Sequence, residues 1–379
     1  MDWQNVTPRS LRVLVPLAAL TLAGSAWVES GQRVVPSPHY DQMLRAAQLS
    51  EQAATALKRE RLERGAFVDA VNDPAETALI GQEYTQITTD RGDLDAKLAS
   101  TDPNFAAVIL GMLHQLDLEP GDCAAVAMTG SFPALNLSTL AALEVFGADT
   151  VLITSVGASN FGATDPYFTW LDMERVLVDD GILRTRSTAA SMGGGNDTGR
   201  GLSPKGRQLL LDAIERADVT PLVEKTIDAS IRRRVELYRA GCGERPIAVY
   251  INVGGGVASL GHSLNGELVP SGSNQRLPTR NYPARGAMMR IADGDVPVIH
   301  LLNVRRLRDR YGLEPVREVL PKPGTGRVFG DVRYDLVRTS LVTAVVLGAL
   351  IALFLLDRRA HRLGTPGPTE RPGSPGGVR

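Results

Sequence analysis

The sequence predicts an α/β fold, in which an open, mostly parallel sheet is covered by helices and flanked by an N-terminal and a C-terminal transmembrane helix. Three observations lead to this prediction. Short apolar runs alternate with longer helical patterns through the middle of the chain, as in a sheet that is buried on both faces. Several helical patterns begin with a capping residue followed by proline. An uncharged apolar stretch lies near each end of the chain.

The composition is that of a folded protein without a strongly charged surface. Hydrophobic residues make up 43% of the 379 residues and charged residues 22%, which excludes a wholly disordered chain. The 41 basic and 42 acidic residues nearly cancel, so nucleic acid is not an expected partner. Cys123 and Cys242 lie too far apart for a zinc-ribbon spacing, and no metal site is expected.

The two apolar stretches, residues 13–28 and 339–356, predict membrane-spanning helices on either side of a domain at residues 29–338. Each uncharged core is about 16 residues long, roughly 24 Å of helix, which is slightly shorter than the ~30 Å hydrocarbon core of a bilayer. The N-terminal stretch also fits a cleaved signal peptide, with small residues at Ala23–Ala26, or a buried core helix.

Arginines at the outer ends of both stretches predict the orientation of the chain. They are Arg9, Arg12, Arg358, Arg359 and Arg362. By the positive-inside rule, residues 1–12 and the basic, Pro/Gly-rich tail 357–379 are expected in the cytoplasm, with the domain outside the cell membrane. Three arginines just before the second stretch oppose this orientation: Arg327, Arg333 and Arg338.

The first half of the domain is expected to contain two helices and then a strand–helix–strand unit. The pattern over residues 39–64 predicts a helical stalk, and Asp102–Pro103 predicts the start of a second helix. The apolar run 123–128, the helical pattern 134–146 and the β-branched run 150–154 form a βαβ unit. Its two strands are expected to be parallel, with a right-handed crossover.

The second half continues the alternation. Cap-then-proline pairs at Ser203–Pro204 and Thr220–Pro221 predict the starts of two helices. The β-branched run 247–253 predicts a strand that ends in three glycines. A further strand is expected over 296–302, followed by a basic helix around 305–310.

Small residues follow three of the predicted strands, at 129–131, 155–159 and 254–256. Ligands of open parallel sheets bind at the carboxyl ends of the strands, and glycine permits close backbone approach. An anionic ligand such as a carboxylate or phosphate is therefore expected, and the alternative is tight turns without a ligand. The candidate ligand-binding residues are Thr129, Gly130, Ser131, Asn136, Asn196, Asp197, Gly254, Gly255 and Gly256.

Neither glycine cluster completes a nucleotide-binding motif. The run after Thr129 lacks the Gly-Lys-Ser/Thr ending of a P-loop, and the run after Asn252 lacks the dinucleotide-binding spacing. ATP and NAD are therefore not expected, and no other cofactor is indicated by the sequence.

Three residues are weak catalytic candidates. Ser131 lies between a predicted strand and a predicted helix, as a nucleophile-elbow serine does, but without the Gly-x-Ser-x-Gly context. His262 lies beside the glycine loop, and Asp197 is an acid on a glycine-rich loop. His114 and His300 are expected to have packing roles. A hydrolytic site is thus possible, although no acid–histidine pair is visible in the sequence.

Two polar segments and the cysteines have alternative interpretations. Residues 187–203 contain five glycines and fit a mobile lid or a disordered surface loop. Residues 88–97 resemble part of a cation-binding loop, although a solvated turn with a helix cap is favoured. Two buried thiols are favoured over a Cys123–Cys242 disulfide.

Several short runs across residues 40–325 together match a known family. They are Leu79–Glu83, Ile87–Thr89, Ser100–Ala107, Gly121–Asp122, Thr129–Asn136, Gly193–Asp197, Gly201–Leu202 and Asn252–Gly256. In these runs the chain resembles the bacterial poly-γ-glutamate system protein family, a membrane-associated family named for occurring with poly-γ-glutamate synthesis components. Thr129 stands where this family is expected to have a second serine.

The resemblance implies a role in making, exporting or processing a γ-linked glutamate polymer at the cell envelope, without supplying catalytic residues. The expected function is that of an accessory membrane component that binds the polymer or partner subunits of the synthesis and export system. The alternative is an extracytoplasmic hydrolase or transferase acting on γ-glutamyl bonds, and a small-molecule sensor is a third interpretation.

Overall fold

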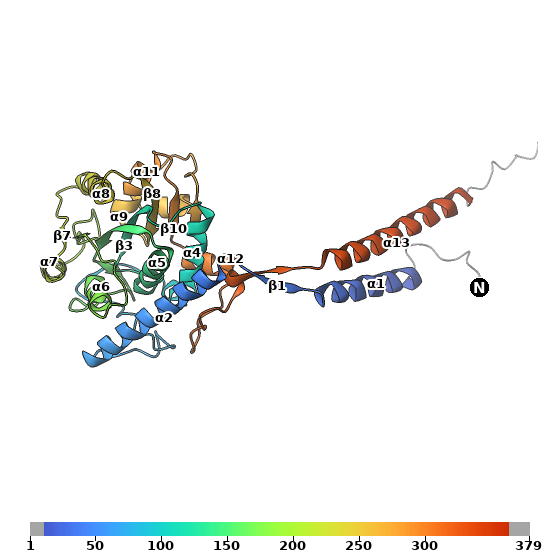
Figure 1. Cartoon of the computed structure of the whole chain (residues 1–379), viewed down its shortest axis with the longest axis horizontal. Helices are drawn as coiled ribbons and strands as arrows, with labels where there is room; N and C mark the ends of the chain where they lie inside the picture. The colour runs from blue at the N-terminus through green and yellow to red at the C-terminus, as the bar shows by residue number, and fades with distance from the viewer. Residues whose placement is uncertain (1–10, 364–379) are drawn as a thin grey trace, which may run out of the picture. The chain divides into compact units, whose positions relative to one another are not determined.

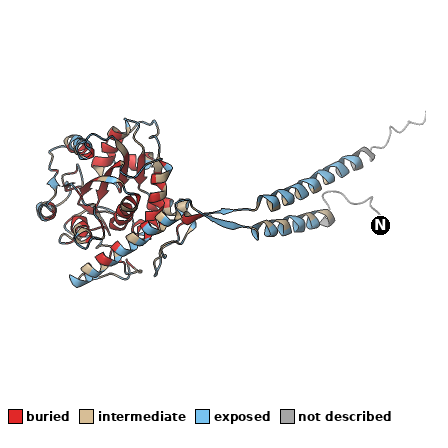
Figure 2. Cartoon of the chain, in the orientation of Figure 1, coloured by how far each residue is buried: buried red, intermediate tan, exposed pale blue. Residues whose placement is uncertain are grey.

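The protein, seen in a computed structural model that describes residues 11–363, divides into two units. Residues 36–330 form the larger unit, and the two chain ends form the smaller one. The larger unit is a seven-stranded sheet with helices packed on both faces (Figure 1). Its inner strands are mostly buried, and many exposed residues lie on the outer sides of the helices (Figure 2). The predicted α/β fold is confirmed for this unit.

The sheet is parallel except at one edge. In order across the sheet, its strands are β7 (Thr220–Pro221), β6 (Ala189–Ser191), β4 (Asp149–Ser155), β3 (Cys123–Thr129), β8 (Ile247–Val253), β10 (Val298–Leu301) and β9 (Gly272–Asn274). Only the edge pair formed by β10 and β9 is antiparallel among these strands. The carboxyl ends of the six parallel strands therefore meet at one edge of the sheet.

Alternate residues of the central strand β3 face two different layers of helices, as the two-residue period of a strand requires. Ala124 and Val126 belong to one buried cluster, and Ala125 and Ala127 belong to another. The first cluster includes helices α2 (Tyr40–Glu63), α4 (Phe105–Gln115), α5 (Pro133–Phe146) and α12 (Val304–Tyr311). The second includes α8 (Ile227–Cys242), α9 (Val257–Leu260) and α11 (Ala287–Ala292).

A third buried cluster lies at the β6 side of the sheet. It contains residues of α6 (Trp170–Asp179) and α7 (Pro204–Arg216). The shorter elements of this unit are β2 (Thr88–Asp90), which pairs with β5 (Ala158–Ser159), the helices α3 (Leu94–Ser100) and α10 (Asn265–Leu268), and a 3-10 turn at Arg327–Phe329.

The helix predicted as a stalk at residues 39–64 is instead an integral part of the domain. It forms α2, which packs against α4 and α5. One face of α2 is buried, including Met43, Ala47 and Leu57. The C-terminal part of this helix is highly charged, but small apolar residues at helical spacing provide a continuous contact face.

The helix predicted to begin at Thr220–Pro221 begins six residues later. Those two residues form β7, the edge strand of the sheet, where proline is tolerated because one side of the strand needs no partner. Helix α8 starts at Ile227, and the Thr226 hydroxyl caps it by accepting a hydrogen bond from Ala229 N–H at 3.2 Å. A proline after threonine was therefore a misleading helix signal here.

Cys123 and Cys242 form a disulfide, so the preference for two free thiols is wrong. Cys123 begins β3 and Cys242 ends α8; the two are 119 positions apart in sequence, and their Cα atoms are 5.7 Å apart. The neighbouring Gly241 lies so close to the sheet that an added Cβ would be 2.7 Å from Val151 Cγ1. This close packing of α8 on the sheet brings the two sulfur atoms together.

The smaller unit contains helices α1 (Leu11–Glu29) and α13 (Leu336–Leu363), which pack against each other. An added Cβ at Gly24 would lie 2.6 Å from Val342 Cγ1, so the missing side chain permits this close approach. The strands β1 (Arg33–Pro36) and β11 (Gly330–Arg333) pair at the base of these helices.

Among the described residues, one helical segment is long and apolar enough to cross a membrane. It is Leu336–Leu356, which spans 21 residues and is not buried within the structure. The apolar part of α1, Val13–Glu29, is shorter than a typical span, so a second crossing stays a prediction. The expected cytoplasmic ends, residues 1–12 and 357–379, lie mostly outside the described residues.

Candidate functional site

A pocket of about 560 Å³ lies at the carboxyl ends of the parallel strands. Loops that follow β3, β4, β6 and β8 line it, together with residues 89–93, Lys97 on α3 and the turn after α9. These segments are far apart in sequence and meet here because parallel strands deliver their carboxyl ends to one edge. A cavity therefore lies at the edge of the sheet where the sequence predicted a ligand site.

The pocket brings together six of the ten candidate residues: Thr129, Ser131, Asn196, Gly255, Gly256 and His262. The four that do not line it are Gly130, Asn136, Asp197 and Gly254. Asn136 is fully buried and donates a hydrogen bond from Nδ2 to the carbonyl oxygen of Thr129 at 2.9 Å. It therefore supports the turn between β3 and α5 from behind.

Gly254 and Gly255 are adjacent but differ in environment. Gly254 is buried with a φ of +87°, and an added Cβ would lie 2.5 Å from Thr129 Oγ1. Gly255 is exposed in the pocket wall, and an added Cβ would meet nothing within 4 Å. The turn requires a glycine at position 254, whereas the missing side chain at Gly255 adds open space to the pocket.

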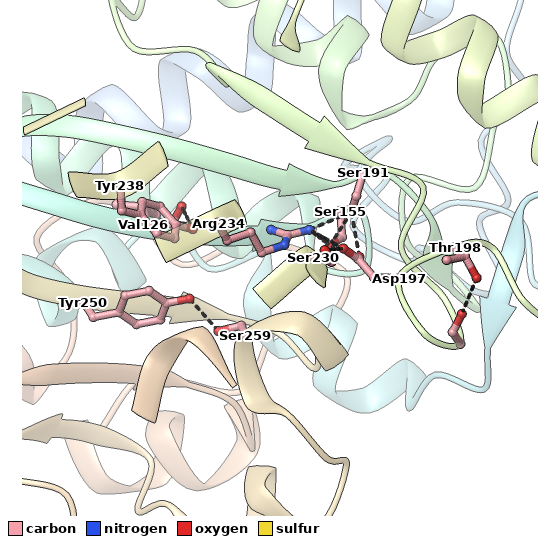
Figure 3. A network of polar contacts seen from close by, with 11 residues as sticks. Val126, Ser155, Ser191, Asp197, Thr198, Ser230, Arg234, Tyr238, Tyr250 and Ser259 are labelled. Atoms are coloured by element: carbon pink, nitrogen blue, oxygen red, sulfur yellow. Dashed lines mark hydrogen bonds and ion pairs between the residues drawn. The ribbon is translucent and has the colours of Figure 1, made fainter. Parts of the chain in front are cut away.

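Asp197 is the centre of a buried polar network behind the glycine loop (Figure 3). It forms an ion pair with Arg234, with 3.0 Å between Oδ2 and Nη2, and both side chains are at most 2% exposed. The hydroxyls of Ser191 and Ser230 donate to its carboxylate at 2.6 and 2.5 Å, and Ser155 donates at 3.2 Å. These contacts make Asp197 an anchor of the loop, and its carboxylate does not line the pocket.

The glycine-rich segment 187–203 is tied into the fold and does not have the features expected of a lid or a disordered loop. It contains β6, an internal strand of the sheet, and the buried anchor Asp197. Between them, Gly193–Gly195 form part of the pocket wall. Five glycines suggested mobility, but here they allow the chain to turn tightly around the pocket.

Lys97 is the principal pocket residue that the sequence analysis missed. Its side chain is 2% exposed, and Nζ donates hydrogen bonds to the carbonyl oxygen of Ser131 and to Ser159 Oγ, the latter at 2.8 Å. Nζ also lies 4.0 Å from the centre of the Phe132 ring. All four residues line the pocket, so this amine connects the loop after β3 with β5.

Burial lowers the pKa of Lys97 to about 7, although the negative charge of Asp93 acts in the opposite direction. Asp93 is itself held in place, because it accepts a hydrogen bond from Ala96 N–H and pairs with Arg305 at 3.1 Å. Lys97 can therefore exchange between its charged and its neutral form near neutral pH. An anion bound in the pocket would favour its protonated form.

The acidic segment 88–97 contributes to the pocket as backbone and cap. Its first part is β2, and Asp93 caps α3, as the favoured interpretation expected. No group of three or more His, Cys, Asp or Glu side chains in the described part of the chain has the arrangement of a metal site. The resemblance to a cation-binding loop therefore receives no support.

Ser131 and His262 share the pocket but make no hydrogen bond to each other in the described structure. Ser131 Oγ accepts a hydrogen bond from Ser159 N–H at 3.0 Å, and His262 Nδ1 accepts one from Leu264 N–H at 3.2 Å. With Asp197 engaged by Arg234, these three candidates do not form a serine–histidine–acid triad.

The remaining inner histidines have the packing roles expected of them. His300 is fully buried, with its ring nitrogens facing Asn252 Nδ2 and the carbonyl oxygen of Gly266, and burial lowers its pKa to about 4. The ring of His114 stacks on that of His39, with the centroids 3.5 Å apart.

The chain matches no protein-family model, no curated protein and no solved structure. The residues that line the pocket therefore provide the evidence for its ligand. These are a buried lysine, glycine-rich strand-end loops and the hydroxyls of Thr129, Ser131 and Ser159.

Proposed function

We propose that this pocket binds carboxylate groups of a γ-linked glutamate polymer, and that the protein is an accessory membrane component of poly-γ-glutamate synthesis or export. The observation that carries this proposal is the position of Lys97. Its amine is buried in the wall of a pocket that is otherwise lined largely by glycine, serine and threonine. A protonated amine with hydroxyls around it is a suitable site for a carboxylate.

The start of helix α5 strengthens the anionic character of this site. Ser131 and Phe132 line the pocket immediately before the helix begins at Pro133. The unpaired N–H groups of the first helical turn and the helix dipole favour negative charge at such a position. The helix start and the protonated form of Lys97 therefore both favour an anion in the same cavity.

Support for the polymer as the ligand comes from where the runs that resemble the poly-γ-glutamate system protein family lie. Three of them, Thr129–Asn136, Gly193–Asp197 and Asn252–Gly256, follow different strands and contribute residues to this one pocket. The segment Ile87–Thr89 reaches it as well, through Thr89. A shared ligand site would explain why four of the eight runs, although distant in sequence, meet at one cavity.

Membrane attachment is proposed through α13 and, with α1, as a two-pass topology with the α/β domain outside the cytoplasm. The span in α13 and the disulfide support this, because structural disulfides persist mainly in oxidising compartments. A reporter active only outside the cytoplasm is expected to be active when fused after Arg245 and inactive when fused after Arg362. The reverse pattern would contradict the proposed orientation.

Polymer binding is tested by titration calorimetry on the full-length protein in detergent micelles. Poly-γ-glutamate is expected to bind, more weakly as salt rises, because charge pairing at a partly exposed site is screened. Poly-α-glutamate of the same length serves as the control for unspecific attraction to negative charge. Equal binding of both polymers, or binding of neither, would contradict a site built for the γ-linked chain.

A further inference from the structure

Beyond binding, we propose that Ser159 and Lys97 form a nucleophile–base pair that cleaves amide bonds of the ligand held in this pocket. The substrate assignment rests on the proposed function, whereas the reactivity of the pair does not. The hydroxyl of Ser159 lies 2.8 Å from Lys97 Nζ, within the distance required for direct proton transfer. Both residues line the pocket, so an acyl group placed there can reach the hydroxyl.

The surroundings of Lys97 favour its action as a base. A lysine accepts a proton only when it is neutral, and burial lowers the pKa of this amine to about 7. Its other hydrogen bond, to the carbonyl oxygen of Ser131, orients the amine toward the pocket wall. The charged or titratable groups nearby are Asp93, which caps the same helix, Arg305 on α12, and Asp90, Arg91 and His262 in the pocket lining.

Ser159 is held in position by its backbone. It ends the short strand β5, which pairs with β2, and its N–H donates to Ser131 Oγ at 3.0 Å. Because Ser131 Oγ accepts that bond, its own proton remains free to donate. The Ser131 hydroxyl therefore lies next to the proposed nucleophile as a donor for a negatively charged oxygen.

The proposed reaction is an ordinary two-step acyl transfer to water. Neutral Lys97 takes the proton from Ser159 Oγ as the oxygen attacks the carbonyl carbon of the amide. The carbon–nitrogen bond then breaks, and the lysine ammonium gives the proton to the leaving amine. A water molecule attacks the resulting serine ester, and Lys97 takes one of its protons and returns it to Ser159 Oγ. The product leaves as a carboxylic acid, which then loses its proton to solvent.

A structural role for the same contacts is the competing explanation, because Lys97 also joins the loop after β3 to β5. The two roles differ in their dependence on pH. As a base, Lys97 must be neutral, so kcat/KM is expected to rise with pH and to level off above about 7. A structural link does not produce such a profile.

The experiment uses the full-length protein in detergent with two probes. A fluorophosphonate that reacts with activated serines is expected to label Ser159, identified by mass spectrometry, whether or not the polymer is the substrate. Poly-γ-glutamate incubated with the protein is expected to become shorter.

The variants test the two residues. Lys97→Met should lower the rates of labelling and of polymer shortening about 10²–10⁴-fold, and Ser159→Ala should abolish labelling. Melting temperatures are measured alongside to show that each variant is folded. Lys205→Met, which removes an exposed lysine, should leave both rates unchanged.

The outcomes separate this proposal from the proposed function. Polymer that binds without shortening, together with unlabelled Ser159, overturns the catalytic pair and leaves the binding function standing. Labelled Ser159 with no polymer binding supports the pair and overturns the polymer as its substrate. A folded Lys97→Met variant that labels and shortens the polymer at wild-type rates would contradict the assignment of Lys97 as the base.

Discussion

Asp197→Ala is expected to lower the free energy of unfolding by about 3–5 kcal/mol, because it leaves the Arg234 guanidinium buried without its counter-ion. The pair is almost completely removed from solvent, and three serine hydroxyls also lose their acceptor. Urea unfolding of the full-length protein in detergent, followed by the fluorescence of the buried Trp170, measures this change.

A matched control is the exposed ion pair of Asp149 with Arg245, whose side chains are 58% and 50% exposed. Asp149→Ala is expected to cost only about 0–1 kcal/mol, since solvent screens this pair. The double variant Asp197→Leu/Arg234→Met should recover part of the loss, because no buried charge is left unpaired. Similar costs for Asp197→Ala and Asp149→Ala would show that the buried network does not anchor the loop.

Replacement of both cysteines by serine is expected to lower the free energy of unfolding by about 2–5 kcal/mol, since the disulfide closes a long loop in the unfolded chain. The two residues are separated by 119 positions, so the bond restricts a large part of the domain. Unfolding in urea with and without reductant measures the effect in the wild-type protein.

The variant with both cysteines replaced by serine is the control for the reductant, because its unfolding should be the same with and without reductant. Thiol labelling of the denatured, unreduced wild-type protein is expected to find no free cysteine. Two labelled thiols, or a wild-type unfolding midpoint that does not respond to reductant, would contradict the bond.

Elements with strong local signals were predictable from the sequence. The strand predicted at 247–253 is β8 itself, and the βαβ unit has its strands and helix within one residue of their predicted ends. In these segments continuous apolar runs, a glycine at the helix end and a proline at the helix start all favour the same structure. The convergence of strand-end loops followed from the parallel topology alone.

The missed features depend on contacts between residues distant in sequence. Lys97 follows several aspartates in the sequence, a pattern typical of an exposed segment. It is buried only because α3 packs beside the pocket. The role of Asp197 depends on Arg234, which lies 37 positions away on another element. The disulfide likewise depends on where α8 meets the sheet. Local sequence patterns do not show which residues far apart in the sequence lie close together in the fold.

The central claim, that a ligand carboxylate occupies the strand-end pocket, is tested most directly by one substitution in its wall. Gly255 is exposed there with open space around it, so Gly255→Leu is expected to change the unfolding free energy by no more than about 0.5 kcal/mol. Its neighbour Gly254 provides the contrast, because Gly254→Leu forces a side chain against Thr129 at a φ of +87° and should destabilise the fold.

The decisive measurement is therefore calorimetric titration of poly-γ-glutamate into the wild-type protein and into folded Gly255→Leu protein. A leucine side chain in the pocket wall takes up space that the ligand would use, so it is expected to weaken binding at least about tenfold, which corresponds to about 1.4 kcal/mol. Wild-type affinity in a Gly255→Leu variant of unchanged stability would show that the polymer does not bind in this pocket.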